Sequence, residues 1–163
     1  MRAVSDTSPI SNLAIIGRLP LLRSQFDEVW IPAAVFSELQ AHPDAASLKE
    51  IQEAVRDGWI KAITIAPSSL LNVLMRHLHR GEAEAITLAA EIGAEVVLID
   101  EQEGRQYAVQ AGLAVTGVLG ILLLAKKNGQ IPSLKPEIRA LRARAGFFIA
   151  PTLEAKILGS AGE

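Results

Sequence analysis

Short apolar runs alternate with longer amphipathic stretches along most of the chain. Five such runs are nearly all apolar and predict strands, at 3–5, 28–31, 59–65, 95–99 and 113–115. The run at 95–99, EVVLI, is the clearest because it is β-branched and ends at a charged residue. Apolar strands separated by helices are typical of a parallel sheet that is covered on both faces. The pattern therefore predicts an α/β fold with a central parallel sheet.

The stretches between these runs have the spacing and the end signals of helices. A helix over 8–19 is predicted to begin with Ser8 as its N-cap and Pro9 in its first position. Gly81 is predicted to break the chain between two helices. The other predicted helices cover 32–41, 44–57, 68–79, 82–93, 101–111 and 117–128.

The chain has about the length of one domain, and its tail differs in character from the rest. From residue 130 onward we expect a basic helix, a short FFI segment and a last helix that packs on the edge of the domain or on a partner. We therefore predict a single domain over 1–163, with a core at about 3–128 and a helical extension at about 130–163.

Composition narrows the possible chemistry. The chain has no cysteine, which excludes disulfides, thiolate metal sites and cysteine nucleophiles and fits a reducing cytosol. Its longest apolar run, at 113–125, is too short to span a bilayer, so we expect a cytoplasmic protein without membrane contact. The net charge of −2 shows no basic footprint for nucleic acid. A site built from carboxylates would itself lower this charge, so the total decides little.

Two carboxylates follow predicted strands directly, at Asp6 and Asp100. Ligands of parallel sheets bind outside the carboxyl ends of the strands, so we expect both carboxylates to face one crevice. A charge at the end of an apolar strand is costly unless it is paired or binds a metal. Taken singly, each is equally explained as a helix cap or a solvated residue.

Three further acids can likewise be either structural residues or ligands of a metal. Glu38 interrupts an apolar stretch in the helix at 32–41. Glu82 and its near neighbour Glu84 lie at the start of the helix predicted over 82–93. Converging carboxylates repel each other unless a hard divalent cation lies between them, and oxygen ligands favour Mg²⁺ or Mn²⁺. Such a cation can activate water and neutralise charge on a phosphodiester, so no nucleophilic side chain is required.

The segments that carry these acids resemble the motifs of a known family. SDTSPISNL with Asp6, IPAAVFSEL with Glu38, RGEAEAITLA with Glu82, and VVLIDEQEGR with Asp100 are similar to the acidic motifs of PIN-domain ribonucleases, in particular a VapC-like, toxin-type branch. The resemblance keeps the order of the motifs and covers about 3–128. It implies a three-layer α/β/α sandwich with a central parallel sheet.

The resemblance also implies an activity and partners. Members of this family are Mg²⁺- or Mn²⁺-dependent endoribonucleases of toxin–antitoxin pairs, commonly homodimers whose small antitoxin covers the active site. The resemblance assigns the catalytic and metal-binding roles to Asp6, Glu38, Glu82 and Asp100. Glu82 stands eighteen residues before Asp100, as the family motif requires, and Glu84 is the alternative ligand.

Four further residues are candidates for contact with the substrate. Thr7 and Ser8 can orient a carboxylate or simply cap a helix, and Arg80 and Arg105 are candidate phosphate contacts. His77 and His79 are two residues apart and do not share a helical face, so a zinc site is disfavoured.

The densest basic stretch leaves two interpretations open. It is either a solvated helix face or a surface for RNA phosphates. Its residues are Lys135, Arg139, Arg142 and Arg144. A domain that binds RNA or protein without cutting remains the alternative to the enzyme.

Overall fold

The computed structural model describes residues 1–163, which form five strands and ten helices. None of the helices combines the length and the apolar character needed to cross a membrane. In chain order the elements are β1 (Arg2–Ser5), α1 (Thr7–Ile15), α2 (Pro20–Gln25), β2 (Glu28–Pro32), α3 (Ala33–Gln40), α4 (Ala45–Arg56), β3 (Ile60–Ile63), α5 (Ser69–Leu74), α6 (Arg80–Ile92), β4 (Val96–Leu98), α7 (Gln102–Gln110), β5 (Val115–Thr116), α8 (Val118–Lys127), α9 (Lys135–Ala145) and α10 (Pro151–Ser160).

The five strands form one sheet in the order β3-β2-β1-β4-β5, and every neighbouring pair is parallel. In the centre, Val4 of β1 lies opposite Trp30 on one side and Val97 on the other. The predicted parallel sheet is therefore confirmed. The chain builds β2 and β3 on one side of β1 and then crosses to the other side for β4 and β5. In open parallel sheets such a reversal opens a crevice at the carboxyl ends of the two strands concerned, here β1 and β4.

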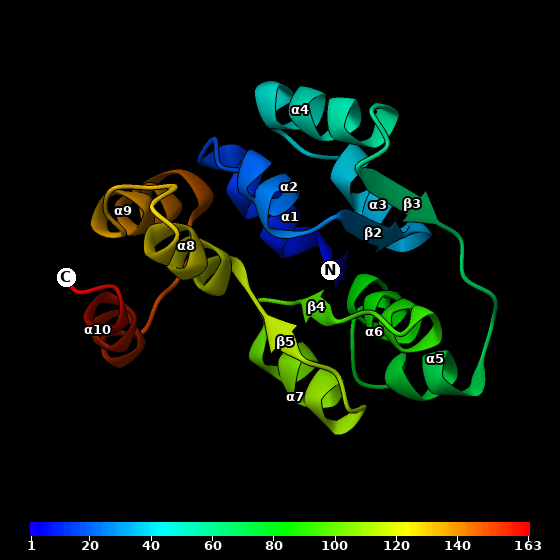
Figure 1. Ribbon diagram of the computed structural model, residues 1–163. Coiled ribbons are helices and arrows are strands. Elements are labelled where there is room, and N and C mark those ends of the chain that lie inside the picture. The colour runs from blue at the N-terminus through cyan, green and yellow to red at the C-terminus, as the bar shows by residue number, and fades with distance from the viewer.

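Alternate residues of the central strands enter two separate cores. Ala3, Val29 and Leu98 belong to a cluster of 27 buried apolar residues beneath α1, α2, α4, α8 and α9. Val4 and Val97 face a cluster of 12 beneath α5, α6 and α7. Figure 1 shows these two groups of helices on opposite sides of the sheet. Because each strand is covered on both faces, its sequence is apolar at nearly every position. The α/β/α sandwich is confirmed.

Two boundaries differ from the prediction for a local reason. The helix predicted over 8–19 is divided, because Gly17 has φ +72° and Pro20 then begins α2. The helix predicted over 68–79 ends at Leu74, after which the amides of Arg76 and His77 bond carbonyls three residues back in tight turns. Helix α6 consequently begins at Arg80.

Gly81 thus lies inside the first turn of α6, and the prediction that it breaks the chain is wrong. A glycine is compatible with a helix when close packing requires it, and a side-chain contact at this position does so in the site described below.

The C-terminal helices are attached to the domain by polar side chains as well as by packing. Arg18, which follows α1, donates to both carboxylate oxygens of Glu137 on α9, with the shortest N–O distance at 2.6 Å. Arg142 of α9 pairs with Glu154 of α10. No residue of α10 is fully buried, although Ile157 and Leu158 pack against the larger core. Helix α10 therefore lies on the outside of the molecule.

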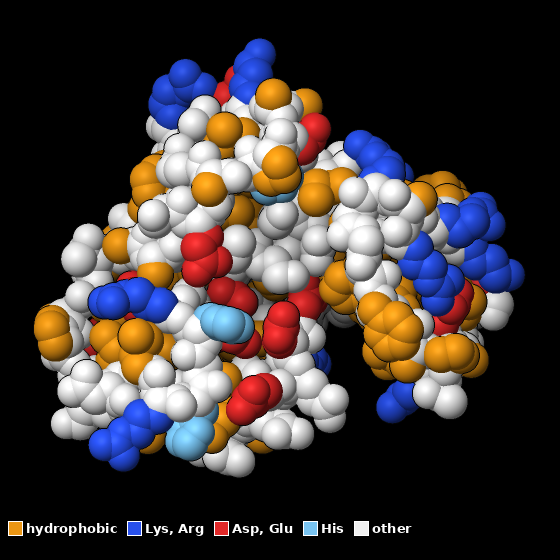
Figure 2. Space-filling model, turned by 180° about the vertical axis from the view of Figure 1, so that it is seen from behind, with side chains coloured by type: hydrophobic (Ala, Val, Ile, Leu, Met, Phe, Trp, Pro, Cys, Tyr) orange, Lys and Arg blue, Asp and Glu red, His pale blue; other side chains and the backbone are white.

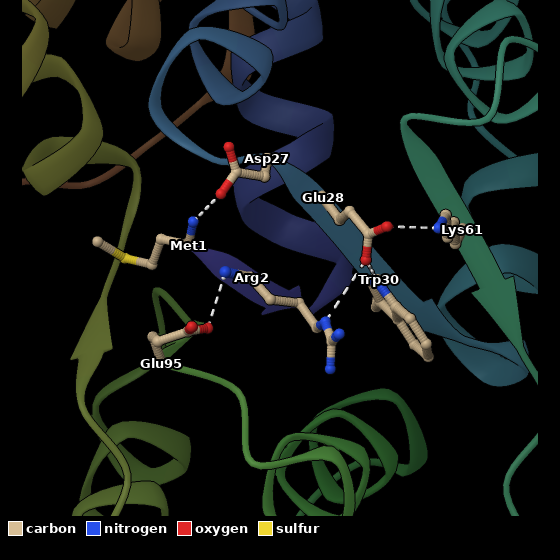
Figure 3. Close-up of polar contacts among 7 residues, drawn as sticks. All are labelled: Met1, Arg2, Asp27, Glu28, Trp30, Lys61 and Glu95. Carbon is tan, nitrogen blue, oxygen red and sulfur yellow. Dashed lines mark hydrogen bonds and ion pairs between the residues drawn. The ribbon is translucent and has the colours of Figure 1, made fainter.

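Paired charges occupy the amino ends of the strands, opposite the crevice (Figure 3). Glu28 accepts hydrogen bonds from Lys61 at 2.6 Å and from the Trp30 indole at 2.8 Å, and Arg2 lies 3.4 Å away. Arg2 and Lys61 also stand over the Trp30 ring, 4.9 and 5.7 Å from its centroid. The bond to Lys61 is the main reason that the pKa of Glu28 is lowered. The charged side chains at this end of the sheet are therefore paired with one another.

Candidate active site

A polar cavity opens at the carboxyl ends of the central strands. Its volume is about 560 Å³, and no hydrophobic side chain lines it. Figure 2 shows acidic side chains gathered near the middle of this face, beside a notch that separates them from a second lobe. The cavity is lined by Asp6, Thr7, Ser8, Ser11, Asn12, Glu38, His79, Arg80, Glu82 and Glu101.

Asp6 is held at the base of this cavity by the sheet itself. Its amide donates to the carbonyl of Leu98 at 3.0 Å, which continues the pairing of β1 with β4. Asp6 occupies the N-cap position of α1, yet its side chain makes no capping bond and is left to the cavity. Only 6% of the residue is exposed. Burial, followed by the negative charges of Glu82, Glu38 and Asp100, raises the pKa of Asp6 to about 7, against the opposing effect of the Thr7 amide.

Glu38 reaches the same place from α3. Its Oε2 accepts a hydrogen bond of 2.6 Å from Thr7, which fixes the direction of the carboxylate. Its Oε1 faces the backbone of Gly81, where a β-carbon would lie only 2.9 Å away. The same β-carbon would lie 3.1 Å from Oδ1 of Asp6. Asp6 and Glu38 therefore converge on one point of α6, and a side chain in place of Gly81 would force their carboxylates to shift.

Glu82 projects from the first turn of α6 and is 5% exposed. Its Oε2 is buried and has no hydrogen-bond partner. Burial raises the pKa of Glu82, and the charge of Glu101 adds to this effect, whereas the backbone amide of His79 opposes it. A buried carboxylate oxygen without a partner is costly, so a proton or a cation would stabilise it.

Asp100 uses both of its oxygens in hydrogen bonds. Oδ1 accepts from the amide of Val118 at 2.7 Å, at the start of α8, and Oδ2 accepts from Ser8 at 2.9 Å. Asn12 donates to Ser8 at 3.0 Å and lies 3.4 Å from the same carboxylate. Burial nevertheless raises the pKa of Asp100, against these bonds and the nearby charge of Arg105. Asp100 is thus fixed more firmly than the other three acids.

The predicted N-cap role of Ser8 is wrong. Helix α1 begins one residue earlier, at Thr7, so Ser8 already lies within the first turn. From there its hydroxyl points across to Asp100 instead of back to the helix amides.

A second hollow adjoins the cavity, and Asp100 belongs to it. This groove has a volume of about 460 Å³ and is polar at one end and apolar along its length. The two hollows meet at Ser8, which lines the cavity and bonds to Asp100. Asp6 thus lines the cavity and Asp100 the adjoining groove, at the carboxyl ends of neighbouring strands, and the charge of Asp100 acts on Asp6. The groove is lined by Asp100, Gln102, Arg105, Thr116, Gly117, Leu119, Gly120, Leu123, Phe147, Phe148, Leu153 and Ile157.

The other predicted site residues are Arg80, Glu84 and Arg105, and each lies in a different place. Arg80 lines the cavity and donates to Glu84 at 2.7 Å. Glu84 is buried but does not line the cavity. Arg105 donates to the carbonyl of Ile99 at 2.9 Å and lines the groove, close to Asp100.

Several residues of the site carry no clear signal in the sequence. Asn12 bridges Ser8 and Asp100, and Ser11, His79 and Glu101 complete the cavity wall. Only Asn12 has a hint, because it stands one helical turn after Ser8.

Three glycines of the site also carry no clear signal in the sequence, and each lies against a site carboxylate. A β-carbon on Gly81 would crowd Asp6 and Glu38, one on Gly104 would lie 2.4 Å from Glu82 Oε2, and one on Gly117 would lie 2.5 Å from Asp100 Oδ1.

The residues fit a hard divalent cation in their chemistry. In this structure, no three acidic or histidine side chains lie close enough together to hold a metal ion at once. However, the charged groups around Asp6 that could ligate a cation are carboxylates, and those of Asp6 and Glu38 converge on one point. Glu82 adds a buried oxygen without a hydrogen-bond partner. Mg²⁺ and Mn²⁺ prefer such oxygen ligands.

The fold and the position of its acids match one family of domains. An all-parallel α/β/α sandwich with carboxylates at the carboxyl ends of its central strands is the architecture of PIN domains, which are generally nucleases that use divalent metals. A family model described as a PIN domain matches residues 2–163. The chain therefore belongs to the PIN-domain family.

A solved structure shows the same fold. The PilT N-terminus domain protein of the hyperthermophilic archaeon Sulfolobus solfataricus P2 is 21% identical, with a TM-score of 0.51, over 74% of this chain and 90% of that one. Among curated proteins, no sequence matches this chain.

Proposed function

We propose that this PIN domain is a Mg²⁺- or Mn²⁺-dependent endoribonuclease that hydrolyses RNA phosphodiesters. The observation that carries the proposal is the polar cavity, in which Asp6 and Glu38 converge and Glu82 has an oxygen without a partner. Gathering like charges in this way destabilises the fold unless a positive ligand offsets it. An RNA-cleaving site of this family supplies the reason for the arrangement.

Asp6, Glu38 and Glu82 would hold the cation, with Asp100 as the fourth carboxylate beside them. When bound, a divalent cation neutralises charge on the scissile phosphate and helps water to attack. Glu84 is the weaker candidate because it bonds to Arg80 and lies outside the cavity wall.

Other residues of the site position these acids or face the substrate. Thr7 orients Glu38, and Ser8 orients Asp100. Arg80 stands at the rim with a largely exposed side chain, where its guanidinium can contact an RNA phosphate. Arg105 has the corresponding place in the groove beside Asp100.

Cleavage of a labelled, unstructured RNA by the purified protein tests the proposal. We expect cleavage with Mg²⁺ or Mn²⁺ and none in EDTA. Asp6→Asn, Glu38→Gln and Glu82→Gln should each lower the rate by about a hundredfold or more, as expected for groups that act directly on reacting charge. Glu91→Gln, on the same helix as Glu82 but outside the cavity, is the matched control. Cleavage that survives all three site variants would contradict the mechanism.

Toxin activity, an antitoxin and a homodimer form the second part of the proposal. A small protein encoded next to this one would cover the cavity and suppress cleavage. Leu70, Val73 and Met75 leave apolar surface exposed around α5, which supports contact with a second copy. Co-purification of the neighbouring gene product and the mass of the isolated protein in solution test the two statements.

A binding module without cleavage is the second candidate function. It is favoured by the absence of a complete ligand set and by the hydrogen bonds that already occupy both oxygens of Asp100. RNA binding without any metal-dependent cleavage would support this candidate over the nuclease.

A further inference from the structure

Positive charge is concentrated in one part of the molecule. We call residues 118–163, which comprise α8, α9 and α10, the C-terminal lobe. The lobe holds seven of the sixteen Lys and Arg but only three of the eighteen Asp and Glu, so its net charge is +4 while that of residues 1–117 is −6. Figure 2 shows Lys and Arg side chains grouped on this lobe, across the notch from the acidic cavity. A basic surface beside an acidic site suits a polyanionic ligand.

Most of these cations have no internal partner. Within the lobe, Arg142 pairs with Glu154, and Lys126 donates to a backbone carbonyl. The other five side chains are exposed and form no ion pair, namely Lys127, Lys135, Arg139, Arg144 and Lys156. They are therefore available to phosphate groups at no cost to the fold.

The groove connects this lobe to the site. Asp100 and Arg105 lie at its polar end, and α8 and α10 form its apolar walls. Phe147 and Phe148 also line it, and Phe148 is 84% exposed. A phenylalanine this exposed is unusual, because burying it would stabilise the fold. Phe148 and Asp100 thus line the same groove.

We propose that the C-terminal lobe binds the single-stranded part of the RNA that flanks the scissile phosphate, with one unpaired base stacked on Phe148. This inference rests on the proposed ribonuclease function. Exposed aromatic rings between Lys and Arg side chains are the usual means of holding single-stranded nucleic acid. A paired base has its faces covered by its neighbours, so the stacking selects unpaired RNA. An apolar protein segment would fill the groove but would leave the five free cations unexplained.

The stacking contact is tested by binding of a short, unstructured oligoribonucleotide in EDTA, measured by fluorescence anisotropy. Phe148→Ala should weaken binding by about 5- to 150-fold, the range that corresponds to one stacked base. Phe148→Trp should keep it, because the larger ring also stacks. Val109→Ala, at an exposed apolar residue of α7 that does not line the groove, is the control and should have no effect. If one abasic position weakens binding to the wild type but not to Phe148→Ala, that base is the stacked one.

The phosphate contacts are tested by salt dependence. In the double variant Arg139→Gln and Arg144→Gln, the slope of log K against log salt should fall by about 1 to 2. The matched control is the pair Arg23→Gln and Arg56→Gln, two exposed arginines on α2 and α4 without ion pairs. This control should keep the wild-type slope.

The outcomes separate this inference from the function on which it rests. If the wild type cleaves RNA but all lobe variants bind it normally, the inference is overturned and the ribonuclease stands. If the wild type neither binds nor cleaves single-stranded RNA, both fail. If Phe148→Ala binds RNA normally but loses a co-purifying protein, the groove is a protein-binding site and the inference is overturned.

Discussion

The carboxylate of Glu82 ends against the backbone of Gly104, so closely that a β-carbon on that glycine would lie 2.4 Å from Oε2. The two residues belong to neighbouring helices, α6 and α7, and their contact fixes where the acid can point. Gly104 is buried within α7, where an alanine would normally favour the helix by about 1 kcal/mol.

Gly104→Ala should therefore separate activity from stability. The methyl group displaces the flexible end of Glu82, and Ile99 Cγ2 at 3.0 Å has to shift only slightly. We expect a melting temperature within a few degrees of the wild type and a fall in RNA cleavage of about tenfold or more. Gly159→Ala, in α10 with nothing within 4 Å of the new carbon, should leave cleavage unchanged and raise the free energy of unfolding by up to about 1 kcal/mol. Full activity in Gly104→Ala would show that Glu82 does not need its present direction.

The raised pKa of Asp6 predicts an unusual pH dependence of stability without divalent cations. The folded state holds the Asp6 proton up to about pH 7, whereas the unfolded chain releases it near the ordinary value of 3.8. Protonation thus stabilises the fold fully below about pH 4, and this contribution is lost as the pH rises toward 7. The difference between the two pKa values corresponds to at most about 4 kcal/mol of stability.

Urea unfolding in EDTA at pH 5 and pH 8 measures this effect. We expect the wild type to lose about 2–4 kcal/mol more than Asp6→Asn between these two values. The same pH dependence in both proteins would mean that Asp6 is ionised in the folded state throughout.

Cation binding should depend on Glu82 and not on Glu84. A ligand that binds only the folded state raises its stability by about 2.7 kcal/mol at a hundred times its Kd. Mg²⁺ or Mn²⁺ should therefore raise the melting temperature of the wild type and of Glu84→Gln, whose amide can still accept the hydrogen bond from Arg80. Glu82→Gln should respond much less. The reverse result would make Glu84 the ligand.

The attachment of α9 depends on the pair between Arg18 and Glu137. The Glu137 side chain is only 8% exposed, so its charge is left buried when the arginine is removed. We expect Arg18→Ala to lower the free energy of unfolding by about 1.5–3 kcal/mol. Arg142→Ala, which breaks the more exposed pair with Glu154, should cost less than about 1 kcal/mol. Equal losses for the two variants would argue against a special role for the buried pair.

The sheet could be predicted from the chain because its signal is local. Each central strand is apolar on both faces, and helices separate the strands, so the parallel sandwich was predicted and is confirmed. The short α2 was not predicted, since Gly17 and Pro20 only mark a break in what otherwise has helical spacing.

The internal contacts of the site could not be predicted because they join distant residues. Ser8 looked like a helix cap, but its partner Asp100 is 92 positions away. Gly81 looked like a breaker, whereas its role is to admit Asp6 and Glu38. Sequence spacing indicates which residues share an end of the sheet; it does not indicate which oxygen each one faces.

The hydrogen bond from the Val118 amide to Asp100 has a consequence for the order of folding. The site combines residues between Asp6 and Val118. Its carboxylates come together only after β4 has paired with β1. Contacts between such distant positions form late, after the local helices. A chain emerging from the ribosome therefore has no assembled site until Val118 is free to fold, so the proposed cleavage of RNA cannot begin while most of the chain is still being made.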